Sequence, residues 1–157
     1  MLAAAGWCVV PVDEATRRGF SGPLAVEEYP TENGPADYAL FNQSELVGIV
    51  EAKRPDVSPQ EVLRQAERYA RGLTNAQRDY DGLRTPFLYS SNGELIWHRD
   101  VRNGLSRSRT IAGFHTPDAL SERLLRDDDA ACQQLIANTN WHERLRPYQI
   151  EANQAVE

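Results

Sequence analysis

The stretch "ADYALFNQSELVGIVEAK", residues 36–53, decides the fold. Apolar and polar residues nearly alternate in its first part, a polar "NQSE" follows, and "LVGIV" is apolar at every position. This order predicts a β-hairpin whose second strand is buried on both faces and is therefore central in a sheet. The hairpin places three charged residues, Asp37, Glu51 and Lys53, toward one end of that sheet.

The residues after the hairpin predict the best helix of the chain, over 58–73. Ser58 is the expected N-cap, Pro59 the first helical residue, and Glu61 completes a capping box. The predicted buried face consists of Val62, Leu63, Ala66, Tyr69, Ala70 and Leu73. On the opposite face, arginines recur at helical spacing: Arg64, Arg68 and Arg71.

The rest of the chain supplies further strands and helices. The N-terminal part predicts a helix tail, a short strand "WCVVPV" and a charged turn, followed by a strand "LAVEEYP". A second hairpin is predicted over 86–100, because Asn92-Gly93 lies between two apolar runs. After a basic loop over 102–109, helices are expected from Thr116-Pro117 and over 129–139, and "RDDD" at 126–129 marks a helix start. The order predicts an α/β fold with a central mixed sheet flanked by helices.

Composition narrows the function classes. A chain of 157 residues is about one domain long and does not need disulfides or a structural metal to be stable. Two distant cysteines give neither a disulfide framework nor a zinc site, and the absence of a long apolar run or a basic leader predicts a cytoplasmic protein without a membrane span. The net charge of −6 indicates that if the domain acts on nucleic acid, another component brings it there.

The charged residues of the first hairpin predict a metal site. Glu51 and Lys53 are two positions apart on a strand and share a face, and the hairpin returns Asp37 beside Glu51. Two carboxylates and the backbone carbonyl of Ala52 make an all-oxygen ligand set suited to Mg²⁺, with Mn²⁺ as a substitute.

This ligand set suits phosphodiester hydrolysis. Such a reaction needs a metal-activated water and a positive group near the developing charge, and Lys53 would orient the water or offset that charge. The alternative is an ordinary ion pair between Glu51 and Lys53 on a solvated strand face.

The helix after the hairpin carries a second pattern, Gln65-x-x-x-Tyr69. Together with Asp37, Glu51 and Lys53 in "GPADYALF…IVEAK", this pattern resembles the RecB-like branch of the PD-(D/E)XK nuclease superfamily. It looks most like the N-terminal endonuclease domain of the R (motor) subunit of type I restriction enzymes. The alternative is a solvated Gln65 and a Tyr69 that only anchors the core.

The resemblance implies roles for individual residues. Asp37, Glu51 and Lys53 match the catalytic positions, while Gln65 and Tyr69 would support the site and contact DNA. The usual proline before the aspartate is Ala36 here. An upstream acidic residue is matched by Glu28 or, alternatively, Glu27, and either could instead be an ordinary outward-facing strand residue.

Arginines are the expected contacts to DNA phosphates. The candidates are Arg64, Arg68 and Arg71 on the helix and Arg102, Arg107 and Arg109 in the basic loop, with a plain solvated surface as the alternative for each. The three histidines, His98, His115 and His142, have no metal-ligand spacing and are predicted to be surface or hairpin-end residues.

The C-terminal "LRPYQIEANQAVE" resembles the start of a superfamily 2 helicase motor, with Arg146, Tyr148 and Gln149 at the positions that read adenine. We therefore expect an endonuclease domain over 1–140 and a linker with the start of a motor over 141–157. The sequence contains no G-x-x-x-x-G-K-[ST], so ATP would bind the full-length motor and not this segment.

The resemblance implies an Mg²⁺-dependent endonuclease that cuts duplex DNA after ATP-driven translocation, with methyltransferase (M) and specificity (S) subunits as partners. Two alternatives remain open. One is a catalytically silent docking module of a helicase subunit, and the other is a stand-alone repair nuclease of the same superfamily.

Overall fold

The computed structural model describes residues 1–53, 59–74, 76–104, 106–126, 133–134 and 146–148. The chain divides into two compact units, Met1–Arg126 and Asp127–Glu157. Several predictions fall largely or wholly outside the described residues and stay predictions: the helix over 129–139, the helix start at 126–129, most of the helicase-like tail and the boundary at residue 140. Among the described residues, no helix is long and apolar enough to cross a membrane.

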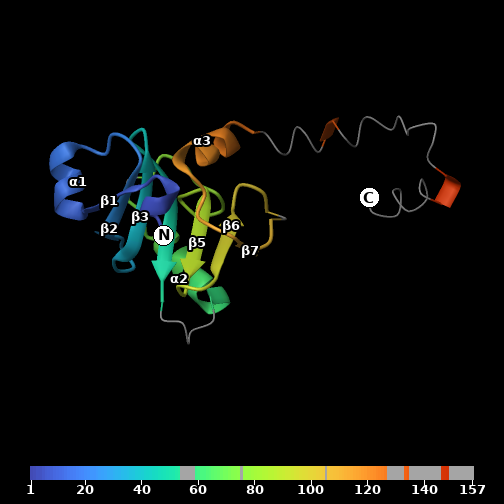
Figure 1. Ribbon diagram of the computed structural model, residues 1–157, viewed down its shortest axis with the longest axis horizontal. Coiled ribbons are helices and arrows are strands. Elements are labelled where there is room, and N and C mark those ends of the chain that lie inside the picture. Colours follow the sequence, from blue (N-terminus) through green and yellow to red (C-terminus); the bar gives the residue numbers. More distant parts are fainter. Residues whose placement is uncertain (54–58, 75, 105, 127–132, 135–145, 149–157) are drawn as a thin grey trace. The chain divides into compact units, whose positions relative to one another are not determined.

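The first unit is built on one mixed sheet of seven strands that follow one another in chain order, as the colours in Figure 1 show. Its elements are η1 (Ala3–Ala5), β1 (Cys8–Pro11), α1 (Val12–Arg18), β2 (Leu24–Tyr29), β3 (Ala36–Asn42), β4 (Glu45–Ala52), α2 (Pro59–Arg71), β5 (Phe87–Ser91), β6 (Ile96–Asp100), β7 (Arg109–Ile111) and α3 (Pro117–Leu125). Strands β1 and β2 are parallel, as are β4 and β5, and the other neighbours are antiparallel. The predicted α/β fold is confirmed.

Both predicted hairpins are present. Strands β3 and β4 pair antiparallel, and β4 is the fourth of the seven strands and therefore central. Gly48 lies close to the backbone of β5, because a Cβ atom there would be 3.0 Å from the Phe87 carbonyl oxygen. In the second hairpin, Asn92 organises the turn by accepting from the backbone N–H groups of Glu94 and Leu95.

The two sheet faces carry separate cores. On one face, α1 and α2 cover the sheet, with Ala15, Leu63, Ala66 and Tyr69 buried against Val26 and Ile49. On the other face, the N-terminal residues Leu2 and Trp7 and the α3 residue Leu120 pack against Leu40, Val50 and Tyr89. The buried face predicted for α2 is confirmed at Leu63, Ala66, Tyr69, Ala70 and Leu73.

Helix α2 begins at Pro59 as predicted, whereas the Ser58 cap and Pro55 lie outside the described residues. The prediction for α3 is also confirmed, since the Thr116 hydroxyl accepts from the Ala119 N–H at the start of the helix. The charged turn predicted after β1 is wrong. Residues Val12–Arg18 form α1, with acidic residues in its first turn and arginines in its last, an arrangement that complements the helix dipole.

Candidate active site

The first hairpin brings Asp37 and Glu51 to the same end of the sheet. Tyr38 pairs with Val50, so the two carboxylates occupy neighbouring positions on adjacent strands, as the sequence predicts. The Asp37 carboxylate also accepts a hydrogen bond from the backbone N–H of Ala52, with 2.6 Å between Oδ2 and N. This bond ties the end of β4 to the Asp37 side chain.

Glu51 is a buried charge with only one of its oxygens paired. The residue is 1% exposed, and its Oε1 lies 2.7 Å from Lys53 Nζ. Within the described part of the chain, Oε2 has no hydrogen-bond partner. An ordinary ion pair on a solvated strand face would leave the carboxylate in water. The burial of Glu51 does not fit this alternative.

The environment of Glu51 shifts its protonation. Burial raises the pKa of the Glu51 carboxyl, and the Asp37 carboxylate raises it further, while the hydrogen bond from Lys53 opposes the shift. An unpaired, buried carboxylate oxygen next to a second carboxylate is costly for the fold, and a cation placed between them would offset that cost.

Lys53 is the one lysine among the 17 Lys and Arg residues of the chain. Its backbone N–H donates to the Ser91 carbonyl at 2.8 Å, which extends the pairing of β4 with β5 by one residue and fixes where the side chain starts. The side chain is 34% exposed. The hydrogen bond to Glu51 raises the pKa of the Lys53 ammonium, and the Asp37 carboxylate adds to the effect, so Lys53 is cationic at neutral pH.

The predicted pair on α2 is formed. The Gln65 side-chain amide donates to the Tyr69 hydroxyl at 2.8 Å. Tyr69 is also close enough to Lys53 to contribute to its raised pKa. Its ring is mostly buried and faces Gly34, where a Cβ atom would lie 3.6 Å from the ring. Tyr69 is therefore both a core anchor and a neighbour of the charged residues.

The C-terminal end of α2 fixes the turn that leads into Asp37. Asn33 donates to the Arg68 carbonyl, Arg68 donates back to the Asn33 carbonyl, and the Glu32 N–H donates to the Gly72 carbonyl. Gly72 is needed here because a Cβ atom would lie 2.9 Å from the Asn33 backbone nitrogen. Arg68, a predicted DNA contact, thus has a structural role in holding this turn.

Both upstream acidic candidates lie near Asp37. A cavity of about 480 Å³ is lined by Glu27, Glu28, Asp37, Tyr38 and Ala52. Burial raises the pKa of the Tyr38 hydroxyl, and the three carboxylates of this cavity raise it further. Sequence reasoning did not single out Tyr38, and its only signal was its place beside Asp37.

Glu28 has an unusual backbone conformation for a strand residue. Its φ is 51°, in the left-handed region that non-glycine residues rarely adopt. The flanking pairs Glu27 with Tyr38 and Tyr29 with Ala36 place Glu28 across from Asp37. Strain of this kind often accompanies function. However, no group of three or more Asp, Glu, His or Cys side chains among the described residues is arranged to hold a metal, so Glu28 does not complete a cluster with Asp37 and Glu51.

The structure places two other residues differently from a plain surface position, and for His98 the expectation is wrong. His98 is 1% exposed and belongs to the core instead of the surface. Its ring lies 4.7 Å from both the Tyr89 ring and the His115 ring, between centroids. Arg102 has a structural role, because it pairs with Asp100 at 2.7 Å and donates to the Arg123 carbonyl, and its contact to DNA stays a prediction. His142 lies outside the described residues.

The mixed sheet with charged residues at the end of its central hairpin defines an α/β domain with a candidate ion-binding site. Residues 13–124 match the family model described as "Type I restriction enzyme EcoKI endonuclease subunit second domain". This chain belongs to that family, which confirms the resemblance seen in the sequence.

The chain is also similar to two proteins whose names refer to type I restriction enzymes. The chain is 28% identical to the type I restriction enzyme EcoKI endonuclease subunit of Escherichia coli (strain K12), over 99% of this chain and 18% of that protein. It is also 28% identical to a solved fragment titled as an HsdR subunit of a type I restriction enzyme from Vibrio vulnificus YJ016, over 78% of this chain and 22% of that one, with a TM-score of 0.44. The chain thus spans about a fifth of the length of each relative.

Proposed function

We propose that this chain is the endonuclease domain of a type I restriction R subunit and that it hydrolyses phosphodiester bonds of duplex DNA with the help of Mg²⁺. The observation that carries the proposal is Glu51, a carboxylate that is almost completely buried and has one oxygen without a partner among the described residues. It lies beside Asp37 and is paired with Lys53.

The residues of the site fit a hard divalent cation. Asp37, Glu51 and the Ala52 carbonyl offer only oxygen atoms, which is the ligand type that Mg²⁺ prefers, and Mg²⁺ commonly completes its shell with water and substrate phosphate. When bound, the ion supplies Lewis acidity and lowers the pKa of a coordinated water. The raised pKa of Glu51 means that the metal and a proton compete for the same carboxylate.

Lys53 would act as a fixed positive charge. Because Glu51 and Asp37 hold Lys53 in its protonated form, it cannot take a proton from water at neutral pH. A cation at this place stabilises the negative charge that builds up on the phosphate as water bonds to phosphorus and the ester oxygen leaves. The attacking water loses a proton to solvent, and the leaving oxygen gains one.

Gln65 and Tyr69 would hold the positive group in place. Their mutual hydrogen bond fixes the hydroxyl beside Lys53, and the ring of Tyr69 supports the turn before Asp37. Glu27 and Glu28 line the cavity next to Asp37 and would orient hydrated cations there. The negative charge of these carboxylates would repel DNA phosphates, so we expect the domain to bind DNA weakly at this cavity when no metal ion is bound.

The larger setting belongs to the same proposal. ATP-driven translocation would come from a motor elsewhere in the full-length protein, and sequence recognition from M and S subunits. The net charge of −6 supports delivery of the domain to DNA by such partners.

The test is plasmid cleavage by the full-length protein with its partner subunits, comparing wild type with Lys53→Ala. We expect the variant to lose cleavage by about 100-fold to 1,000-fold while ATP-driven translocation continues. Arg18→Ala, which removes one exposed cation of α1, is the matched control and should cut normally. Normal cleavage by Lys53→Ala would refute the assignment and favour the docking module.

A further inference from the structure

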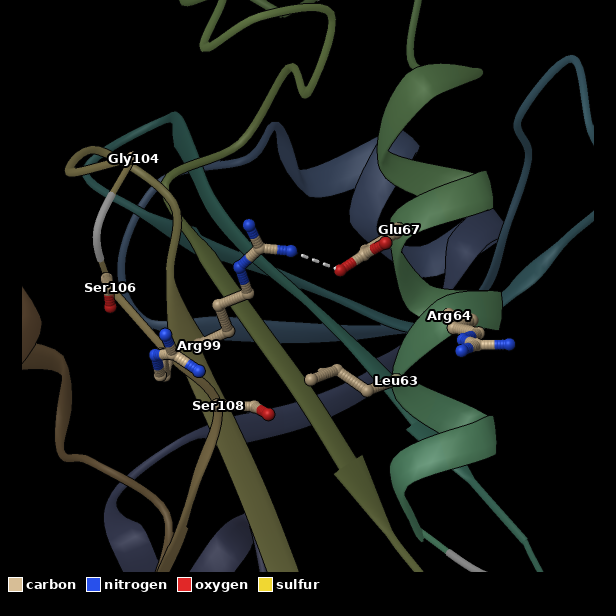
Figure 2. Close-up of a pocket in the computed structure, with 8 residues that line it drawn as sticks. Leu63, Arg64, Glu67, Arg99, Gly104, Ser106 and Ser108 are labelled. Carbon is tan, nitrogen blue, oxygen red and sulfur yellow. Dashed lines mark hydrogen bonds and ion pairs between the residues drawn. The ribbon is translucent and has the colours of Figure 1, made fainter.

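A groove lined by arginines lies beside α2, apart from the acidic cavity next to Asp37. Its volume is about 690 Å³, and the residues that matter to its chemistry are Arg64, Glu67, Arg99, Ser106, Arg107 and Ser108. Figure 2 shows Arg99 of β6 reaching across to Glu67 of α2, with Ser106 and Ser108 on the segment that leads into β7. Three arginines and two serines therefore line the groove together with one carboxylate, and Arg99 is the arginine that contacts this carboxylate.

The groove contains two arginines that the fold leaves available. Arg68 and Arg71 donate to the carbonyls of Asn33 and Asp81, and Arg102 is held by Asp100. By contrast, Arg64 and Arg107 are exposed, and neither forms a hydrogen bond or ion pair with another described residue. The arginines predicted to contact DNA thus fall into two groups. Arg68, Arg71 and Arg102 stabilise the fold, whereas the guanidinium groups of Arg64 and Arg107 can bind an external anion.

The third arginine of the groove, Arg99, is paired with Glu67. The Glu67 Oε1 pairs with Arg99 Nη1, and both side chains remain about one-third exposed. An exposed pair of this kind is weak in water, so a phosphate that enters the groove can compete for Arg99. Arginine suits such an exchange because its planar fork of donors matches carboxylate and phosphate alike.

The groove is separated from the candidate active site by the width of one helix. Glu67 is two residues from both Gln65 and Tyr69, which puts it about 160–200° around the helix from them. A helix with its side chains is about 10–12 Å across. This distance corresponds to about three nucleotide steps along a duplex at 3.4 Å per phosphate.

We propose that this groove binds the sugar-phosphate backbone of duplex DNA about three nucleotides from the bond that is cut, with Arg64, Arg99 and Arg107 as phosphate contacts and Glu67 as the group that DNA displaces. The proposal rests on the proposed function for the identity of the polymer. It adds a positively charged contact on a protein whose overall charge is negative, and thereby a way to align the strand over Lys53.

The test is the binding of a short fluorescent duplex to the 157-residue chain, followed by anisotropy over a range of salt concentrations with EDTA and without added metal. We expect Arg64→Ala/Arg107→Ala to weaken binding roughly tenfold or more at about 0.1 M salt and to reduce the slope of log K against log salt by about 2. Arg17→Ala/Arg18→Ala removes the same charge from α1 and should change the slope by much less.

A second variant changes affinity in the opposite direction. Glu67→Gln frees Arg99 and removes a negative charge, so we expect severalfold tighter binding, which a misfolded protein would not show. Equal affinities and slopes for wild type, the groove variant and Glu67→Gln would overturn the proposal. Binding of a single-stranded RNA as tightly as the duplex, or no binding of the duplex by wild type, would overturn it as well.

The outcomes separate this proposal from the proposed function. Asp37→Asn should bind the duplex at least as tightly as wild type, because it is not in the groove and loses a negative charge. If Asp37→Asn still cuts DNA while the groove variant binds poorly, the proposed active site fails and the groove stands. If the groove variant binds normally and Asp37→Asn does not cut, the groove proposal fails and the proposed active site stands.

Discussion

Two buried polar groups lie on opposite faces of the same sheet, and they solve the problem of burial differently. Glu51, on the α2 face, keeps a positive partner in Lys53 and a second carboxylate beside it. His98, on the other face, is surrounded by the rings of Phe87, Tyr89 and His115, and both of its ring nitrogens lack a partner among the described residues.

Their protonation differs accordingly. Burial lowers the pKa of His98 to about 3, so His98 is uncharged in the folded protein at neutral pH. Burial also raises the pKa of Glu51, but Lys53 works against this shift and keeps a charge in place. The difference teaches that an unpaired buried polar atom indicates a binding site where a counter-charge and a second ligand accompany it, and a core residue where they do not.

The largest expected effect in this comparison is the acid sensitivity caused by His98. Because its folded-state pKa is lowered from 6.5, the unfolded chain binds the proton more tightly, and the fold loses stability as pH falls from about 6.5 toward 3. We expect His98→Leu to reduce this loss by several kcal/mol at the acid end. Urea unfolding at a series of pH values measures it, and an unchanged pH profile would contradict the assignment.

The next effect is a gain of stability on removing the buried charge of Glu51. The folded-state pKa is raised from 4.5, so the metal-free fold loses stability as pH rises through 4.5 and Glu51 ionises. We expect Glu51→Gln to stabilise the metal-free domain at neutral pH by roughly 1 kcal/mol, as relief of active-site strain often does. Lys53 is one-third exposed and can remain hydrated.

The measurement for Glu51→Gln is the thermal midpoint in EDTA at neutral and acidic pH. Glu14→Gln, which changes a partly exposed acidic residue of α1 that also pairs with an arginine, is the control. The gain should disappear near pH 4, where the wild-type carboxyl is protonated. A loss of stability at neutral pH would mean that the Lys53 ion pair stabilises the fold and that the buried charge is structural.

A smaller effect is expected at Tyr69. Tyr69→Phe removes the hydroxyl that accepts from Gln65 and leaves the ring against Gly34, so we expect a loss of less than about 1 kcal/mol in unfolding free energy. DNA cleavage by the assembled enzyme should fall by more than this loss of stability accounts for, since Lys53 loses a polar neighbour. Equal losses in Tyr69→Phe and Gln65→Ala would support a shared role, whereas full cleavage would reduce Tyr69 to a core anchor.

The smallest expected effect is a change in the pKa of the Lys53 ammonium. Since Lys53 is the sole lysine, reductive methylation with ¹³C gives one lysine signal apart from that of the N-terminus. We expect this signal to titrate above 10.5 in wild type and closer to 10.5 in Glu51→Gln, because the hydrogen bond that Lys53 donates to the Glu51 carboxylate is the main cause of the raised pKa. Identical titrations would show that the ion pair is absent in solution.

The sequence predicted those parts of the fold that carry strong local signals. "NQSE" between two apolar runs, Asn92-Gly93 and Thr116-Pro117 each specify a turn or helix start within a few residues. The charged cluster followed from the first hairpin alone, because the register of a short hairpin brings Asp37 beside Glu51.

Elements that depend on distant contacts escaped prediction. Helix α1 is only seven residues long and is covered by the sheet on one side, so its periodicity is too short to detect. Strand β7 has three residues and pairs only with β6 among the described residues. The burial of His98 and the partners of Arg68 and Arg102 depend on tertiary packing, because residue type alone favours the surface for the two arginines and favours neither surface nor core for the histidine.

The central claim is that Asp37 and Glu51 hold one divalent ion, and the most direct measurement is Mn²⁺ binding to the 157-residue chain, followed by electron paramagnetic resonance at neutral pH. We predict that Asp37→Asn and Glu51→Gln each weaken binding roughly tenfold or more. Asp13→Asn, at an exposed position of α1, should bind like wild type. Equal Mn²⁺ binding by all four proteins would contradict the claim.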